Sequence, residues 1–199
     1  VHLEGFHELL ELNLSYRQSL KNVSLHDLPS LKRLNLGSIR QLKKVELDGL
    51  TSLSELSLSD YRGHILDISS LVTLTHLDLC NASFSKIEGI ERLVHLTHLD
   101  LRECRLKDSI RLLNLTKLTH LDLSNSTITE LDALLHMTDL VELKLKSCKS
   151  LRDINGLRSI RHITALDFTE CTSLKELNGI GELTQLTQLT LKKCFAIEH

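Results

Sequence analysis

The run Leu96-Thr97-His98-Leu99-Asp100-Leu101 decides the fold, because its pattern of leucine-x-x-leucine-x-leucine recurs from one end of the chain to the other. Each copy begins 21 to 23 residues after the one before it. A repeat of this length with this motif predicts a solenoid in which short structural units stack on one another. The copies open at Leu9, Leu31, Leu53, Leu74, Leu96, Leu118, Leu140, Ile163 and Leu186.

Within one copy, the alternation at Leu99 and Leu101 predicts a short β-strand that points both leucines into a core. One repeat cannot bury its leucines alone. Neighbouring repeats must therefore stack, with their strands parallel and about 4.8 Å apart. The outward side chains of this copy are then His98, Asp100 and Arg102, and the apolar side chains of its return segment are Leu106, Ile110 and Leu115.

The return segments predict two kinds of structure. After Cys148 and Cys171 their apolar spacing and glycines are typical of short helical or 3₁₀ turns. The first two return segments instead copy the strand motif and predict extended structure; their apolar residues are Leu20, Val23, Leu25, Leu42, Val45 and Leu47. The predicted fold is an α/β solenoid, a curved array with a parallel concave β-sheet and short helical, 3₁₀ or extended convex segments.

The motif and its period resemble those of the leucine-rich repeat superfamily, and the resemblance implies a binding scaffold rather than an enzyme. The 22-residue repeat from Leu118 to Leu140 is similar to repeats of phosphatase-1 regulatory subunits and internalins. The Cys-x-x-Leu-x-x-Ile/Leu-x-Gly units at Cys148 and Cys171 resemble repeats of trypanosomatid leucine-rich repeat proteins and plant immune receptors. The subfamily stays open.

The unbroken repeat predicts one domain over residues 1–199, with about nine repeats and no Gly/Ser/Pro-rich linker. Leu3 and Phe6 continue a return segment whose strand is missing, and Cys194 begins another that stops. Solenoids cover their end leucines with capping repeats. Neither end carries one, so we expect the chain to be an excerpt of a longer array or multidomain protein.

The composition argues against several functional classes. A formal charge of −2 with dispersed lysines and arginines argues against generic nucleic-acid binding, which needs a clustered basic face. The chain has no apolar run of 18 residues, so membrane insertion is not expected. It also lacks a nucleophile elbow, a glycine-rich phosphate loop and a metalloprotease motif. We therefore predict no catalytic residues, no metal ligands and no cofactor.

Four of the five cysteines stand at the ninth position of a repeat, where the superfamily usually has asparagine. No CxxC pair occurs, so buried structural thiols are favoured over a metal site. The odd total and the absence of paired cysteines predict an intracellular, reducing compartment. Cys80, which follows Leu79, is predicted to face outward. The four are Cys104, Cys148, Cys171 and Cys194.

Five N-x-S/T triplets keep an extracellular or parasite-surface ligand-binding protein as an alternative, because such triplets are glycosylated in secreted proteins. Repeats rich in asparagine, serine and threonine also produce them readily. They begin at Asn13, Asn22, Asn81, Asn114 and Asn125.

The outward positions of the strands are predicted to be free of packing demands, so we expect them to carry the specificity for a protein partner. Their aromatic content is low, which favours recognition by polar and charged groups. The predicted partner-binding residues are Tyr16, Arg33, Glu55, His76, Asp78, His98, Asp100, Arg102, His120, Asp122, Glu142, Lys144, Lys146, Asp167 and Lys192.

Three successive repeats read Thr-His-Leu-Asp-Leu and predict a row of histidines beside a row of aspartates. Such rows could hold a divalent metal or pair a general base with an orienting acid. Repeat duplication also copies residues without selecting them for a site, and an open sheet leaves them hydrated. We favour this second interpretation, and we expect partner binding to change between about pH 5 and 8.

The sequence thus predicts a non-catalytic protein-interaction module that binds its partner on the concave sheet. An alternative is the substrate-recognition arm of a ubiquitin ligase or another regulatory complex, which would use the same surface. A metal-dependent activity at the histidine and aspartate rows is a minor alternative. The identity of the partner and the oligomeric state do not follow from the sequence.

Overall fold

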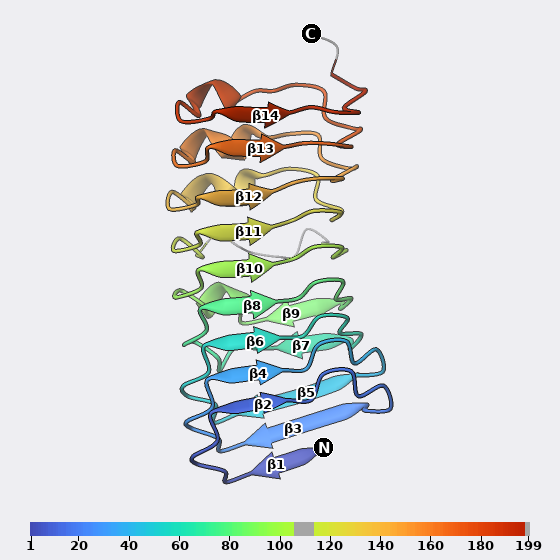
Figure 1. Cartoon of the computed structure of the whole chain (residues 1–199), viewed down its shortest axis with the longest axis vertical. Helices are drawn as coiled ribbons and strands as arrows, with labels where there is room; N and C mark the ends of the chain where they lie inside the picture. The colour runs from blue at the N-terminus through green and yellow to red at the C-terminus, as the bar shows by residue number, and fades with distance from the viewer. Residues whose placement is uncertain (106–113, 198–199) are drawn as a thin grey trace. The chain divides into compact units, whose positions relative to one another are not determined.

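The computed structural model describes residues 1–105 and 114–197, so the predicted apolar positions Leu106 and Ile110 lie outside the described residues. The chain divides into two compact units, residues 1–96 and residues 97–199. Within each unit, successive repeats stack and their motif strands, which carry the leucine motif, run in parallel (Figure 1). The predicted solenoid fold is confirmed in its repeat architecture.

The four motif strands of the first unit pair in chain order, each with the motif strand of the following repeat. The register places equivalent leucines side by side, with Leu12 opposite Leu34 and Leu56 opposite Leu77. Equivalent outward residues therefore also stand side by side and form rows. The strands are β2 (Glu11–Asn13), β4 (Arg33–Asn35), β6 (Glu55–Ser57) and β8 (His76–Asp78).

The return segments of the first unit form strands of their own. Extended structure was predicted for the first two repeats and is confirmed there by β3 (Asn22–His26) and β5 (Lys44–Asp48), which pair in parallel. Leu3 lies in β1 (His2–Glu4), which pairs with β3. The extended form continues further than predicted, because β7 (Ile65–Asp67) pairs with β9 (Lys86–Glu88). One short 3₁₀ helix, η1 (Ile90–Arg92), follows.

In the second unit the described return segments carry 3₁₀ helices. The turns predicted after Cys148 and Cys171 are confirmed as η3 (Asn155–Ser159) and η4 (Ile180–Glu182), and η2 (Asp132–His136) precedes them. Motif strand β11 pairs with both β10 and β12, and β13 pairs with β14. These strands are β10 (His98–Asp100), β11 (His120–Asp122), β12 (Glu142–Lys144), β13 (Ala165–Asp167) and β14 (Gln188–Thr190).

A glycine allows the 3₁₀ helices η2 and η3 to pack closely. A Cβ atom added at Gly156 would lie only 1.8 Å from the carbonyl oxygen of Leu131. Any larger side chain at this position would therefore force the two return segments apart.

The leucine rows make the core of each unit. In the repeat of Leu96, the relative exposure of Leu99 is 2 % and that of Leu101 is 0 %. The inward and outward assignments made from the alternation are thus confirmed. Ninth-position side chains add to the core beyond the strands, and the buried ones are Ile39, Tyr61, Ala82, Cys104, Ser126, Cys148, Cys171 and Cys194.

Each motif strand is followed by a residue in the left-handed backbone region, at the eighth position of its repeat. This conformation turns the chain out of the strand, and residues other than glycine adopt it at a cost. No glycine occupies the position in any repeat. The residues are Tyr16, Ser38, Asp60, Asn81, Glu103, Asn125, Ser147, Glu170 and Lys193, with φ between 53° and 65°.

Candidate binding face

We call the outward side of the motif strands the motif-strand face; its residues occupy the third, fifth and seventh positions of each repeat. Every predicted partner-binding residue is either exposed or half-buried. Most belong to this face, in one unit or the other. Tyr16 does not: it occupies the eighth position, in the turn after β2, where its side chain is 74 % exposed.

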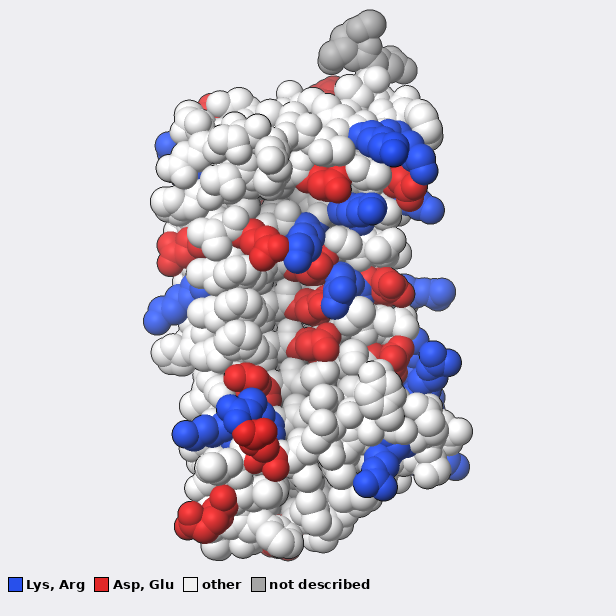
Figure 2. Space-filling model, in the orientation of Figure 1, with Lys and Arg blue, Asp and Glu red and all other residues white. Residues whose placement is uncertain are grey.

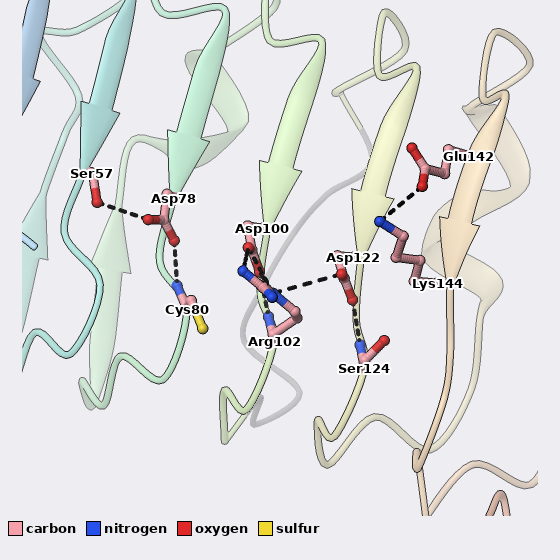
Figure 3. A network of polar contacts seen from close by, with 9 residues as sticks. All are labelled: Ser57, Asp78, Cys80, Asp100, Arg102, Asp122, Ser124, Glu142 and Lys144. Carbon is pink, nitrogen blue, oxygen red and sulfur yellow. Dashed lines mark hydrogen bonds and ion pairs between the residues drawn. The ribbon is translucent and has the colours of Figure 1, made fainter. Parts of the chain in front are cut away.

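A charged network crosses the motif-strand face of the second unit (Figure 3). The Arg102 guanidinium donates to Asp100 from Nε at 2.8 Å and from Nη2 at 2.6 Å, both to Oδ2. Its Nε also lies 3.6 Å from Oδ2 of Asp122 on the neighbouring strand. Arg102 thus partly neutralises two carboxylates that the parallel register places side by side.

The fifth-position aspartates also have a structural role that the sequence reasoning missed. The Oδ1 atoms of Asp100 and Asp122 each accept a hydrogen bond at 2.9 Å from the main-chain N–H two residues later. Asn13 and Asn35 accept the same bond at 3.0 and 2.9 Å. These side chains cap the turn after the strand. The fifth position was expected to be free of packing demands, and the structure adds a hydrogen-bonding role there. The signal was available, because Asp or Asn recurs there.

Glu142 contacts Lys144 at the fifth position of its own repeat and His120 at the third position of the preceding one. Its Oε1 accepts from Lys144 Nζ at 2.8 Å, and its Oε2 lies 3.6 Å from Nε2 of His120, an ion pair when that histidine is protonated. The hydrogen bond from Lys144 holds the pKa of the Glu142 carboxyl below its usual range. The same bond raises the pKa of Lys144.

Two of the predicted histidines stack on each other. The ring centroids of His98 and His120 are 4.1 Å apart, and the planes differ by 9°. Parallel rings have parallel nitrogen lone pairs, which do not converge on one ion at the 2.0–2.1 Å that zinc requires. Among the described residues, no group of three or more His, Cys, Asp or Glu side chains has the arrangement of a metal site. The stack therefore does not support the metal alternative.

In the first unit, polar contacts also link neighbouring repeats. Arg33 forms an ion pair with Glu11 on the adjacent strand. The Ser57 hydroxyl donates to Oδ2 of Asp78 at 2.7 Å, while Oδ1 of Asp78 accepts from the N–H of Cys80 at 2.9 Å (Figure 3). Asp78 thus has the same capping role as Asp100 and Asp122.

Cations and anions alternate over this side of the molecule. Figure 2 shows lysine and arginine side chains interspersed with acidic ones on the face that it draws. Near the end of the second unit, Lys193 donates to Glu170 at 2.6 Å. This bond, with a hydrogen bond from Ser147, lowers the pKa of Glu170. Lys146 and Lys192 are exposed. A partner for this surface needs charges of both signs.

The cysteines of the ninth position are buried thiols that form no disulfide, as predicted. Three of them donate to main-chain carbonyl oxygens of the preceding repeat: Cys148 Sγ to Leu123 at 3.1 Å, Cys171 Sγ to Leu145 at 3.2 Å and Cys194 Sγ to Phe168 at 2.9 Å. The hydrogen bond with the Cys148 thiol and burial both raise the pKa of Cys171. Cys80 is half-buried rather than exposed. An intracellular location, inferred from unpaired cysteines, stays a prediction.

None of the described helices has the length and apolar character needed to cross a membrane.

Comparisons with known proteins find leucine-rich repeats in part of the chain and a similar fold in solved structures. Residues 94–136 match the family model of Leucine Rich repeats (2 copies). A solved structure described as the functional domain of InlJ from Listeria monocytogenes, which includes a cysteine ladder, is 22 % identical with a TM-score of 0.62. The match covers 94 % of this chain but only 42 % of the InlJ chain.

A second structure, the internalin InlF from Listeria monocytogenes, is 17 % identical with a TM-score of 0.46, covering 96 % of this chain and 86 % of the other. Among curated proteins none matches the chain. At this identity the InlJ likeness concerns the fold. Together with the repeated motif and the stacked parallel strands, it shows a leucine-rich repeat fold, and the family model identifies leucine-rich repeats in residues 94–136.

Proposed function

We propose that this chain is a non-catalytic module that binds a protein partner on its motif-strand face. Leucine-rich repeat folds are typically interaction modules, and their repeated strands provide an extended binding surface. The observation that carries the proposal is the ordered network of charged and imidazole side chains on the second unit, around Asp100, Arg102 and His120.

Preorganisation supports this face as the docking surface. The capping bonds of Asp100 and Asp122 fix their carboxylates, and Arg102 is held between them. Side chains that are already ordered lose less conformational entropy when a partner binds. A partner that presents complementary charges would therefore meet a fixed pattern rather than a set of mobile side chains.

Recognition would rest on polar and charged groups. The chain has no tryptophan and only two tyrosines, and the strands of the second unit present histidine, carboxylate and lysine side chains outward. Because interfaces usually draw most of their energy from aromatic and arginine anchors, we expect a moderate affinity with Arg102 as one anchor. The same surface would serve if the chain were the recognition arm of a larger regulatory complex.

The test compares the wild-type chain with a face variant that carries His98→Ala, Asp100→Asn, Lys144→Ala and Lys146→Ala. Asparagine at position 100 keeps the turn cap, as Asn13 and Asn35 do. Both proteins are used to capture partners from extracts of the source cells, after circular dichroism has shown that both are folded. We expect one or more proteins to be retained by the wild type and lost by the face variant. Capture of the same set by both would refute docking on this face.

A further inference from the structure

The seventh positions of the last three repeats form a row across the end of the second unit. The carbonyl oxygen of each seventh-position residue accepts the main-chain N–H of the eighth-position residue in the preceding repeat. Ser147 donates in this way to Thr169 at 2.7 Å, and Glu170 donates to Lys192 at 2.8 Å. These bonds hold Lys146, Thr169 and Lys192 in register. At the spacing of parallel chains, the main chains of Lys146 and Lys192 lie about 10 Å apart.

The two lysines of this row differ from the other lysine and arginine side chains on the motif-strand face of the second unit. Arg102 and Lys144 each form an ion pair with a carboxylate of the face itself. Lys146 and Lys192 are exposed, and neither side chain forms an ion pair or a hydrogen bond with a described residue. The chain therefore leaves these two positive charges for another molecule to neutralise.

The side chain between the two lysines adds a hydrogen-bond donor. The hydroxyl of Thr169 has one hydrogen to donate, and it has no partner in the described part of the chain. Its main-chain groups are already used, because the N–H donates to Oδ1 of Asp167 at 2.8 Å and the carbonyl accepts from Ser147. The row thus presents two ammonium groups with a hydroxyl between them.

The carboxylates around the row restrict what can dock there. Asp167 caps the turn before Thr169 and forms no ion pair with a described cation. The carboxylate of Glu170 is bonded to Lys193. A nucleic acid carries a phosphate at every nucleotide and would also bring negative charge against Asp167. A peptide can place carboxylates opposite the two lysines alone, which favours a protein segment as the occupant.

We propose that Lys146 and Lys192 dock an extended acidic segment of the protein partner across the end of the second unit. The inference rests on the proposed function, since it names the chemistry of the partner for the same face. In an extended segment, carboxylates two residues apart lie on one side, about 7 Å from each other. Lysine ammonium groups on flexible four-carbon stems can reach such a pair from main chains at the spacing of this row.

The chain offers a matched control for the two lysines. The test variant carries Lys146→Gln and Lys192→Gln. The control carries Lys117→Gln and Lys175→Gln, which remove the same charge from exposed positions of the second unit that lie off the motif-strand face. Because all four side chains are exposed, we expect circular dichroism to show both variants folded. Any difference between them then reports where the charge is, not how much there is.

The probe is a short fluorescein-labelled peptide in which glutamate alternates with threonine. Its affinity is measured by fluorescence anisotropy at low ionic strength, where exposed charges are weakly screened. We expect saturable binding to the wild type and to the control, and about 10-fold weaker binding to the test variant. The same peptide with glutamine in place of glutamate should not bind.

Three results would overturn the proposal: no binding of the acidic peptide to the wild type, equal losses in the test variant and the control, or tighter binding of single-stranded oligothymidylate than of the peptide. The titration needs no captured partner, so it can fail while docking on the motif-strand face stands. In that case the face variant would still lose its partners, but those partners would not use an acidic segment.

Discussion

At the scale of single residues, one side chain often has both a structural and a surface role. Asp122 gives Oδ1 to the N–H of Ser124 and turns Oδ2 toward Arg102. The two oxygens of one carboxylate thus cap a turn and contribute charge to the candidate binding face. Substitutions that separate these two roles are more informative than alanine.

Asp122→Ala should lower the free energy of unfolding by about 1 kcal/mol, because the N–H of Ser124 loses its side-chain acceptor. Asp122→Asn should stay close to the wild type, since Asn13 caps the first motif turn in the same way. The long contact with Arg102 adds little stability, because exposed ion pairs rarely contribute much. Urea denaturation of both variants measures the difference. Equal losses in the two would show that charge, not capping, is what matters.

Ser38→Gly should raise the free energy of unfolding by about 1 kcal/mol. Ser38 has φ 57°, in the left-handed region of the backbone. This conformation is energetically unfavourable for residues other than glycine. The main-chain N–H of Ser38 donates to the carbonyl oxygen of Ser59, and the carbonyl oxygen of Ser38 accepts from the Gln18 side chain. Neither hydrogen bond involves the Ser38 side chain, so both would persist in the variant. Ser38→Ala is the control and should give no gain. A glycine variant less stable than the wild type in thermal unfolding would contradict this account of the turn.

At the scale of the repeat, the ninth position ties several turns to the repeat before them. The thiols of Cys148, Cys171 and Cys194 donate to carbonyl oxygens at 3.1, 3.2 and 2.9 Å. In the first unit, Tyr61 has a comparable role: its hydroxyl, which has one hydrogen to donate, lies 3.2 Å from the carbonyl oxygen of Lys43 and 3.0 Å from that of Ile65. Different side chains thus fill one structural position.

Cys171→Ala should destabilise the protein by roughly 1–2 kcal/mol, because it leaves a small cavity at a fully buried site and removes the bond to Leu145. Cys171→Ser should lose less, since serine keeps a donor and Ser126 already occupies the equivalent position. Cys80→Ala, at the half-buried thiol, should change stability little. The three are compared by urea unfolding. If Cys80→Ala costs as much as Cys171→Ala, the ninth-position thiols have no special structural role.

At the scale of the whole molecule, the sequence predicts what depends on the leucine period and misses what depends on local hydrogen bonds. The register, the core rows and the 3₁₀ turns after Cys148 and Cys171 follow from apolar spacing. Strands β7 and β9 were missed because residues 63–68 and 84–89 do not carry the full leucine-x-x-leucine-x-leucine motif. The aspartate caps were missed because a carboxylate on an exposed face was interpreted as a free charge.

Acid should destabilise the protein, because Asp67 and Glu142 have lowered pKa values. The causes are hydrogen bonds from Ser69 to Asp67 and from Lys144 to Glu142. A carboxyl with a lowered folded-state pKa contributes stability above its unfolded value near 4, and that contribution is lost as the pH falls through the folded value.

Unfolding free energies measured from pH 5 down to pH 2 should therefore fall, and Asp67→Asn should reduce the fall. Asparagine cannot titrate, but it can still accept the N–H of Ser69. Identical acid profiles for the variant and the wild type would show that Asp67 is not one of the groups responsible.

The central claim is that the motif-strand face binds the partner and the opposite side does not. The most direct measurement is isothermal titration of a captured partner with three proteins: the wild type, the face variant, and a return-side control carrying Glu130→Gln, His136→Ala, Arg152→Ala and Lys175→Ala. The control removes the same kinds of charge from exposed positions of the second unit. We predict an affinity loss of about 30-fold or more, roughly 2 kcal/mol, for the face variant and no change for the control. Equal affinity of the face variant and the wild type, or a loss confined to the return-side control, would contradict the account.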